Sequence, residues 1–335
     1  MEIQSSCGTK QRIATIDILK GVGIILVVLG HVDNTALGEW IYTFHMPLFF
    51  VVSGLLFRPG KDVYLKKAKT ILIPYFIFAV ISYLYWRFFE IRFRPQDPSL
   101  DINAHFLDIL WQREEFKFNV ALWFLPCLFI ATSLLNLITT NIRNRVVVSL
   151  ICVLWVLAAT LYSPSTRSCW IMETWCAFPF VVLGWLLGRE RLSEIDSALA
   201  AVPKYVRALA VVPLIAVVFI PHGGSMMVAR YSMDSYAYYF FVALVCVASV
   251  YVLSTLLVSC KWLRWLGVNT LAIMCIHEPV KRIVIKMFSV VANIGTDELR
   301  GYVICSIAVT AAVLLILVPI CKLIDKYVPW VWGRS

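Results

Sequence analysis

Long apolar segments recur along the whole sequence, and they constrain the fold more than any other feature. Hydrophobic residues make up 61% of the 335 residues and charged residues only 15%, whereas about 25% is usual in soluble domains. The segments are long enough to cross about 30 Å of hydrocarbon. The sequence therefore predicts an all-α, polytopic integral membrane protein.

Polar clusters divide the chain into about ten predicted transmembrane helices. They are centred near residues 16–32, 40–57, 70–90, 120–140, 146–162, 171–188, 206–220, 237–258, 265–280 and 300–321. The ninth is interrupted by Asn269, His277 and Glu278. The first lacks a small-residue cleavage signal and carries charged residues, so we interpret it as a retained span and not as a signal peptide.

The distribution of basic residues predicts the orientation. If the N-terminus is inside, the inside loops hold most of the Lys and Arg residues, among them Arg58, Arg145 and Arg189. We therefore expect both termini in the cytoplasm. Residues 1–335 would form a single membrane domain, with short cytoplasmic tails at about 1–12 and 323–335.

Composition argues against several classes of partner. The net charge of +10 is explained by basic residues beside spans, where they meet anionic lipid headgroups, so we expect no nucleic acid. The ten cysteines include no Cys-x-x-Cys pair, and we expect no metal centre and no disulfide framework. The sequence leaves the oligomeric state open, a homo-oligomer included.

A line of polar residues runs through the first apolar segment. Asp17, Lys20 and His31 fall within about 60° of one another on a helix, and roughly 16 Å separates Lys20 from His31. Ionisable groups in a span cost about 2.5–3.5 kcal/mol each at its centre, so this face implies an interior cavity or mutual pairing. An ion pair of Asp17 with a snorkelling Lys20 is the simpler alternative, but it leaves His31 unexplained.

A second histidine, His45, begins the second predicted span. A connection of about a dozen residues can bring it to the same membrane depth as His31, at the end of the first span. Two histidines at one depth are a candidate acid/base site, because a neutral imidazole can take a proton from a hydroxyl and return it. The alternative is that each histidine is an ordinary interface residue.

The next predicted inside loop is strongly basic. Arg58, Lys61, Lys66, Lys67 and Lys69 form a cationic collar that can hold phosphates by charge and hydrogen bonds. The orientation of the protein in the membrane would by itself produce such a cluster. The combination with a histidine on the far side favours a donor that binds in the cytoplasm and is discharged toward the outside.

These residues resemble the acyltransferase-3 family of integral-membrane acyltransferases, especially sugar O-acetylases of the fucose 4-O-acetylase type. The matching pieces keep their order over most of the chain: 17–21 through Gly30 and His31, 44–50 through Ser53 and Gly54, 73–75, 122–126, and 267–271 leading to His277. The first two pieces together are specific. The later ones are weak when taken alone.

The resemblance implies about ten membrane helices, acetyl-CoA or another acyl-CoA as donor substrate, and an extracytoplasmic carbohydrate hydroxyl as acceptor. It also implies a bacterial inner (cytoplasmic) membrane and the decoration of a surface polysaccharide. His31 would be essential, paired with a basic residue eleven positions earlier, which is Lys20 here. The basic pair of the following loop would correspond to Lys66 and Lys69.

We therefore hypothesise an O-acetyltransferase with His31 as general base or as a transiently acylated group. The other predicted site residues have the following roles: His45 orients or relays protons, Asp17 holds Lys20, Lys66, Lys67 and Lys69 bind donor phosphates, and Trp123, Asn269 and His277 line the cavity. Two other classes remain open: a transporter or flippase of a polysaccharide precursor, and a ligand-sensing membrane module.

Overall fold

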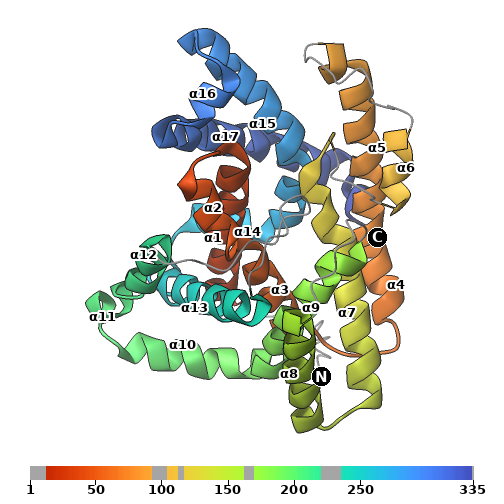
Figure 1. The fold of residues 1–335 in the computed structure, drawn as a ribbon, viewed down its shortest axis with the longest axis vertical. Helices are drawn as coiled ribbons and strands as arrows, with labels where there is room; N and C mark the ends of the chain where they lie inside the picture. The colour runs from red at the N-terminus through yellow and green to blue at the C-terminus, as the bar shows by residue number, and fades with distance from the viewer. Residues whose placement is uncertain (1–12, 93–103, 112–116, 162–169, 220–234, 334–335) are drawn as a thin grey trace, which may run out of the picture.

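The computed structural model describes residues 13–92, 104–111, 117–161, 170–219 and 235–333. The described residues form helices and no strand, so the all-α prediction is confirmed for them (Figure 1). The predicted N-terminal tail, residues 1–12, lies outside the described residues.

The helices follow one another along the chain with short connections. In the first half they are α1 (Ala14–Val32), α2 (Ala36–Tyr42), α3 (His45–Leu55), α4 (Val63–Lys67), η1 (Ala68–Leu72), α5 (Ile73–Phe88), η2 (Glu90–Arg92), α6 (Ala104–Trp111), η3 (Val120–Trp123), α7 (Phe124–Asn141) and α8 (Arg145–Leu161). In the second half they are α9 (Trp170–Leu187), η4 (Arg189–Arg191), α10 (Leu192–Ala201), α11 (Lys204–Ala208), α12 (Val211–Phe219), α13 (Tyr236–Ser254), α14 (Lys261–Val268), α15 (Thr270–Ala292), α16 (Thr296–Arg300), α17 (Val303–Tyr327) and η5 (Pro329–Trp332).

Within the described residues, five helical stretches are long and apolar enough to cross a membrane, or six if a pair bent by 113° forms one span. The five are Ala14–Val32, Val63–Arg92, Val120–Asn141, Tyr236–Ser254 and Val303–Tyr327. These stretches indicate a multi-pass membrane protein. Each of the ten predicted segments contains helix, but the number ten and the cytoplasmic termini stay predictions.

Three predicted spans differ from simple crossing helices. The segment 40–57 is divided between α2 and the 11-residue α3, because the chain leaves helical geometry at Phe44. The segment 206–220 is divided between the short α11 and α12. The segment 265–280 breaks at Asn269, and its second part continues as α15 to Ala292 with several charged side chains.

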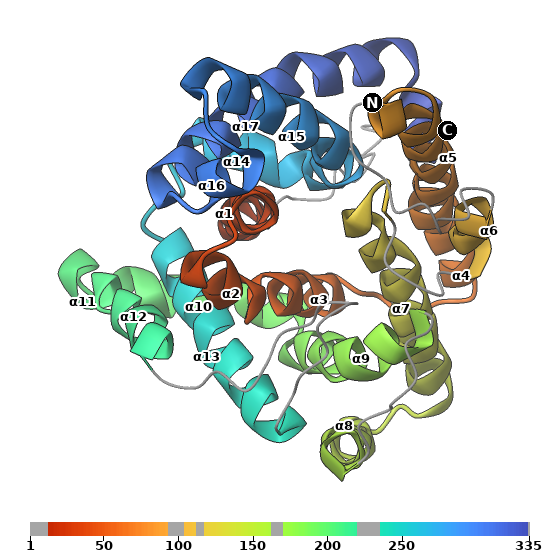
Figure 2. The same cartoon turned by 45° about the horizontal axis from the view of Figure 1, so that its top comes forward.

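Helix α1 lies at the centre of the fold. It packs against α2, α3, α13, α14, α15 and α17, and Figure 2 shows these helices arranged around it. Glycine permits the closest of these approaches, to α14. A Cβ atom on Gly21 would collide with the Leu263 carbonyl oxygen, and one on Gly267 with the carbonyl oxygen of Asp17. Small residues at such crossings let membrane helices pack by van der Waals contact.

A second glycine pair joins α3 to α9. A Cβ atom on Gly54 would collide with the carbonyl oxygen of Val181, and a Cβ on Gly184 with that of Val51. The two backbones are therefore in direct contact, and the C-terminal ends of the two helices lie close together. This crossing fixes the relative position of the segments that follow Leu55 and Leu187.

Large apolar side chains remain exposed on the peripheral helices. Examples are Leu154 and Leu161 on α8, Phe219 on α12, and Ile304 and Leu315 on α17. Apolar surface of this extent is expected where lipid, and not water, surrounds a helix.

The C-terminal segment folds back on the helices. Residues 323–327, which the sequence analysis assigns to a cytoplasmic tail, form the end of α17. In η5, the ring of Trp332 stacks on Phe78 of α5 at 5.2 Å between centroids, and its Nε1 donates a hydrogen bond to Asp325. The end of the described chain is thus held against α5.

Candidate active site

The rings of Tyr42 and His277 lie against His31 where α1 ends. His31 lies in the last turn of α1, and its ring centroid lies 5.3 Å from that of His277 on α15. Tyr42, the last residue of α2, lies 5.9 Å from His31 and 5.1 Å from His45, again between centroids. We call His31, Tyr42, His45 and His277 the histidine cluster. Tyr42 therefore links the two histidines that the sequence analysis places at one depth.

The backbone of α15 sets the protonation pattern of His277. Its Nδ1 lies 2.9 Å from the carbonyl oxygen of Ile273 and 3.0 Å from that of Met274. A carbonyl oxygen only accepts hydrogen bonds, so Nδ1 carries the proton and Nε2 holds the lone pair. No described group donates a hydrogen bond to this buried Nε2 atom. His277 thus presents an unused proton acceptor inside the cluster.

Similar contacts orient the other two histidines. Nδ1 of His45 lies 2.9 Å from the carbonyl oxygen of Ile41 and must donate to it. The Tyr42 hydroxyl donates to the Gly30 carbonyl oxygen at 2.9 Å, and its oxygen lies 3.3 Å from Nδ1 of His31. With its proton given to Gly30, the hydroxyl accepts from His31 Nδ1, which leaves Nε2 of His31 as the basic nitrogen.

A buried charge network follows the histidine cluster on α15. Glu278 is 2% exposed, and one of its carboxylate oxygens lies 2.8 Å from Nζ of Lys281. The other accepts a hydrogen bond from Nε of Arg282 at 3.1 Å, and Arg282 also donates to Glu90 of η2 at 2.9 Å. Two carboxylates and two cations therefore neutralise one another, which offsets the cost of burying them.

This network also holds the end of α1. Lys281 donates to the carbonyl oxygen of His31 at 3.1 Å, and Arg300 Nε donates to that of Val32 at 2.7 Å. Cations are favourable at a helix C-terminus, where carbonyl groups lack partners within the helix. The backbone that carries His31 is thus fixed by two cationic side chains.

A pocket of about 420 Å³ opens beside the network. It is lined by Glu278, Lys281, Arg282, Ile285, Thr296, Asp297 and Arg300. Side chains that donate hydrogen bonds and side chains that accept them thus surround this space, and one of them, Lys281, also contacts the backbone oxygen of His31. Among the described side chains, no group of His, Cys, Asp and Glu residues has an arrangement that could hold a metal ion.

The remaining residues of the predicted polar line lie away from the cluster. Asp17 is buried near the start of α1, and its backbone oxygen contacts Gly267 of α14. The described side chains show no ion pair between Asp17 and Lys20. Because Lys20 precedes His31 by eleven residues on one helix, roughly 16 Å separates them along the axis.

The other predicted site residues are also dispersed. Lys66, Lys67 and Lys69 lie on α4 and η1, with Lys66 and Lys69 exposed. Trp123 is buried among aromatic residues, 6.5 Å from the ring of Phe50 between centroids. Asn269 lies at the junction of α14 and α15, and its side chain donates to the carbonyl oxygen of Trp265 at 2.8 Å. Of the predicted cavity residues, the structure joins only His277 to His31.

Several residues of the site did not emerge from the sequence analysis. The spacing of Glu278, Lys281 and Arg282 is a detectable signal, because residues three and four apart share a helix face. Tyr42 and Glu90 give no such signal, since their partners lie on other helices.

Comparison with known proteins assigns the chain to a family. A family model described as an acyltransferase domain matches residues 13–318. The chain therefore belongs to the acyltransferase-3 family, as the resemblance of its motifs predicts. No solved structure matches it significantly.

Two curated relatives are both named nodulation protein NolL. A nodulation protein NolL of Sinorhizobium fredii is 46% identical over 63 residues, which cover 15% of this chain and 17% of that protein. A nodulation protein NolL of Mesorhizobium japonicum is 26% identical over 217 residues, which cover 56% of this chain and 51% of that protein. The chain thus matches about half the length of the second relative and less of the first.

Proposed function

We propose that this protein is a membrane O-acyltransferase that moves an acetyl group from cytoplasmic acetyl-CoA to a hydroxyl of an extracytoplasmic carbohydrate. The observation that carries the proposal is the buried, unpartnered Nε2 of His277 beside the ring of His31. A basic nitrogen that is desolvated and held in one tautomer suits proton removal from a hydroxyl. Membership of the acyltransferase-3 family gives the reaction class.

In the reaction, the acceptor oxygen attacks the thioester carbonyl carbon, and the bond from that carbon to the CoA sulfur breaks. His31 or His277 takes the hydroxyl proton and returns it to the leaving thiolate. A transiently acylated His31 is the second route, with attack first by Nε2 and then by the acceptor. Tyr42 and His45 position His31, and Lys20 lies farther along α1 on the side from which the donor arm would come.

We place the acceptor in the pocket beside Glu278 and Arg300. Its carboxylates accept hydrogen bonds from sugar hydroxyls and its cations donate to them. The donor enters at the opposite end of α1. This arrangement fits a bacterial inner membrane, with the acceptor a cell-surface polysaccharide or its lipid-linked precursor.

The test is release of CoA by the purified protein from labelled acetyl-CoA, with wild type beside His31→Ala. Ser289→Ala is the matched control, because Ser289 lies on α15 about three turns beyond His277. We expect turnover that His31→Ala abolishes and Ser289→Ala retains, with both variants folded. Turnover that survives in His31→Ala would refute the role of His31. Flux of a polysaccharide precursor in liposomes without CoA release would indicate a transporter. Binding of acetyl-CoA without CoA release and without such flux would indicate a sensor.

A further inference from the structure

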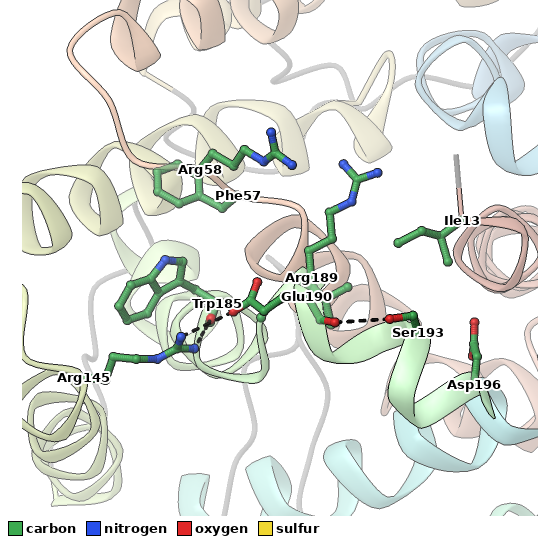
Figure 3. Close-up of a pocket in the computed structure, with 11 residues that line it drawn as sticks. Ile13, Phe57, Arg58, Arg145, Trp185, Arg189, Glu190, Ser193 and Asp196 are labelled. Carbon is green, nitrogen blue, oxygen red and sulfur yellow. Dashed lines mark hydrogen bonds and ion pairs between the residues drawn. The ribbon is translucent and has the colours of Figure 1, made fainter. Parts of the chain in front are cut away.

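Three arginines from separate parts of the chain line one pocket of about 510 Å³. Arg58 follows α3, Arg145 begins α8, and Arg189 begins η4 after α9 (Figure 3). We call this site the arginine pocket. It also touches Ile13, directly before α1, so it lies at the end of α1 opposite the histidine cluster.

The local backbone places Arg189 in the pocket. Helix α9 ends at Leu187, and Gly188 adopts a φ of 75°, which turns the chain at once into η4. A side chain is disfavoured at this positive φ, which glycine adopts readily. Arg145 closes the turn, since it donates to the carbonyl oxygens of Trp185 at 3.2 Å and Leu186 at 2.6 Å.

The acidic residues of the pocket already have partners. Asp196 accepts hydrogen bonds from Thr15 at 2.9 Å and from the Tyr251 hydroxyl at 2.6 Å. Glu190 pairs with Arg145 at 3.4 Å.

The three arginines among the lining residues outnumber the two acidic residues. Within the described part of the chain, Arg58 takes part in no ion pair. Figure 3 shows the side chains of Arg58 and Arg189 extending into the same space. The planar fork of a guanidinium group matches phosphate oxygens, so two such groups that line one space can bind the same phosphate group.

The dimensions and walls of the pocket favour a nucleotide over a single phosphate ion. Its volume is within the range of about 300–1,000 Å³ that small-molecule sites occupy. Phe57 and Trp185 add aromatic surface to the lining, on which a purine base can stack. Lys66, Lys67 and Lys69, which the sequence analysis assigns to donor phosphates, do not line this pocket.

We propose that the arginine pocket binds the phosphate groups of the nucleotide part of acyl-CoA, with Arg58 and Arg189 as the phosphate ligands. The proposal rests on the proposed function, because that function requires an acyl-CoA donor. It assigns the donor phosphates to Arg58 and Arg189 in place of Lys66, Lys67 and Lys69. Arg145 acts as a positioning residue that holds the turn at Gly188.

The experiment measures equilibrium binding of labelled CoA to the purified full chain in nanodiscs. We expect Arg58→Gln and Arg189→Gln each to weaken CoA binding at least tenfold. Arg191→Gln is the matched control, because Arg191 lies in the same helical turn but does not line the pocket. It should change the affinity less than twofold, and so should Lys66→Gln and Lys69→Gln. Loss of affinity in the lysine variants alone would overturn the proposal.

Two further measurements separate phosphate binding from other roles. With acetyl-CoA, the arginine variants should raise KM and leave kcat unchanged; with acetyl-pantetheine, which has no phosphate, they should match wild type. An equal loss with both donors would indicate a structural role and overturn the proposal. Unchanged CoA affinity together with weaker binding of anionic lipid would assign the pocket to a lipid headgroup and overturn it as well.

The outcome also distinguishes this proposal from the proposed function. If wild type and His31→Ala bind CoA and only wild type releases it from acetyl-CoA, the acyltransferase stands whatever the arginine variants do. If wild type binds no CoA, both proposals fall.

Discussion

The two ends of α1 use charged side chains in opposite ways. At the end that carries His31, Glu278 and Glu90 are buried and paired with Lys281 and Arg282. At the end near Ile13, the arginine pocket is open, and its cations outnumber its acidic residues. Buried charge must be neutralised within the protein, whereas exposed charge can await a ligand. The first end thus has a fixed geometry, and the second is the end at which we propose that an external anion binds.

This contrast separates two kinetic quantities. We call the end of α1 with the histidine cluster the histidine end and the end with the arginine pocket the arginine end. If the chemistry takes place at the first and the donor binds at the second, substitutions at the histidine end lower kcat and substitutions at the arginine end raise KM. The following predictions test that separation.

We expect the largest effect from His277→Ala. Loss of a general base lowers rates by about 10²–10⁴-fold, so kcat should fall by that factor while the KM for acetyl-CoA stays close to the wild-type value. Steady-state CoA release gives both quantities, with Ser289→Ala as the control on the same helix. A raised KM with normal kcat would contradict the assignment of chemistry to this end.

Glu278→Gln tests whether the buried cations Lys281 and Arg282 need the negative charge of Glu278. The substitution leaves Lys281 buried beside Arg282 without the carboxylate that pairs with both, so we expect a loss of about 3–5 kcal/mol in the free energy of unfolding. The matched substitution Glu190→Gln removes an exposed ion pair with Arg145, and should cost at most about 1 kcal/mol. Unfolding in detergent measures both. Equal losses of unfolding free energy in the two variants would contradict the distinction between a buried, paired end and an exposed one.

The sequence and the structure agree on what is local and differ on what is long-range. The apolar segments predict helices, because each helix depends on neighbouring residues. The sequence places His31 and His45 at one depth, and in the structure the ring of Tyr42 contacts both. The family motif that leads to His277 identifies that residue as a candidate, but it does not predict that its ring contacts His31. The pairing of Arg282 with Glu90 and the convergence of Arg58 with Arg189 depend on how distant helices pack, which one sequence does not specify.

Gly54→Ala tests how the arginine pocket is built. The new methyl group would collide with the Val181 carbonyl oxygen and push α3 away from α9, the two helices that precede Arg58 and Arg189. We expect a loss of about 1–3 kcal/mol in stability and weaker CoA binding, although no charge changes. Gly60→Ala is the control, since its Cβ would meet only Val63 at an ordinary 3.8 Å. Normal CoA affinity in Gly54→Ala would show that the pocket does not depend on this crossing.

The smallest expected effect is a gain of affinity. Glu190→Gln removes a negative charge from the arginine pocket and frees Arg145 of its carboxylate partner, so CoA should bind more tightly. Exposed pairs contribute about 0.2–1 kcal/mol, which predicts a gain of roughly 1.4- to fivefold that shrinks as salt screens the charges. Glu194→Gln, one turn farther on and outside the pocket lining, should leave the affinity unchanged. Weaker binding in Glu190→Gln at low salt would instead show that this carboxylate maintains the shape of the site, and the contrast between the two ends of α1 would then be one of degree.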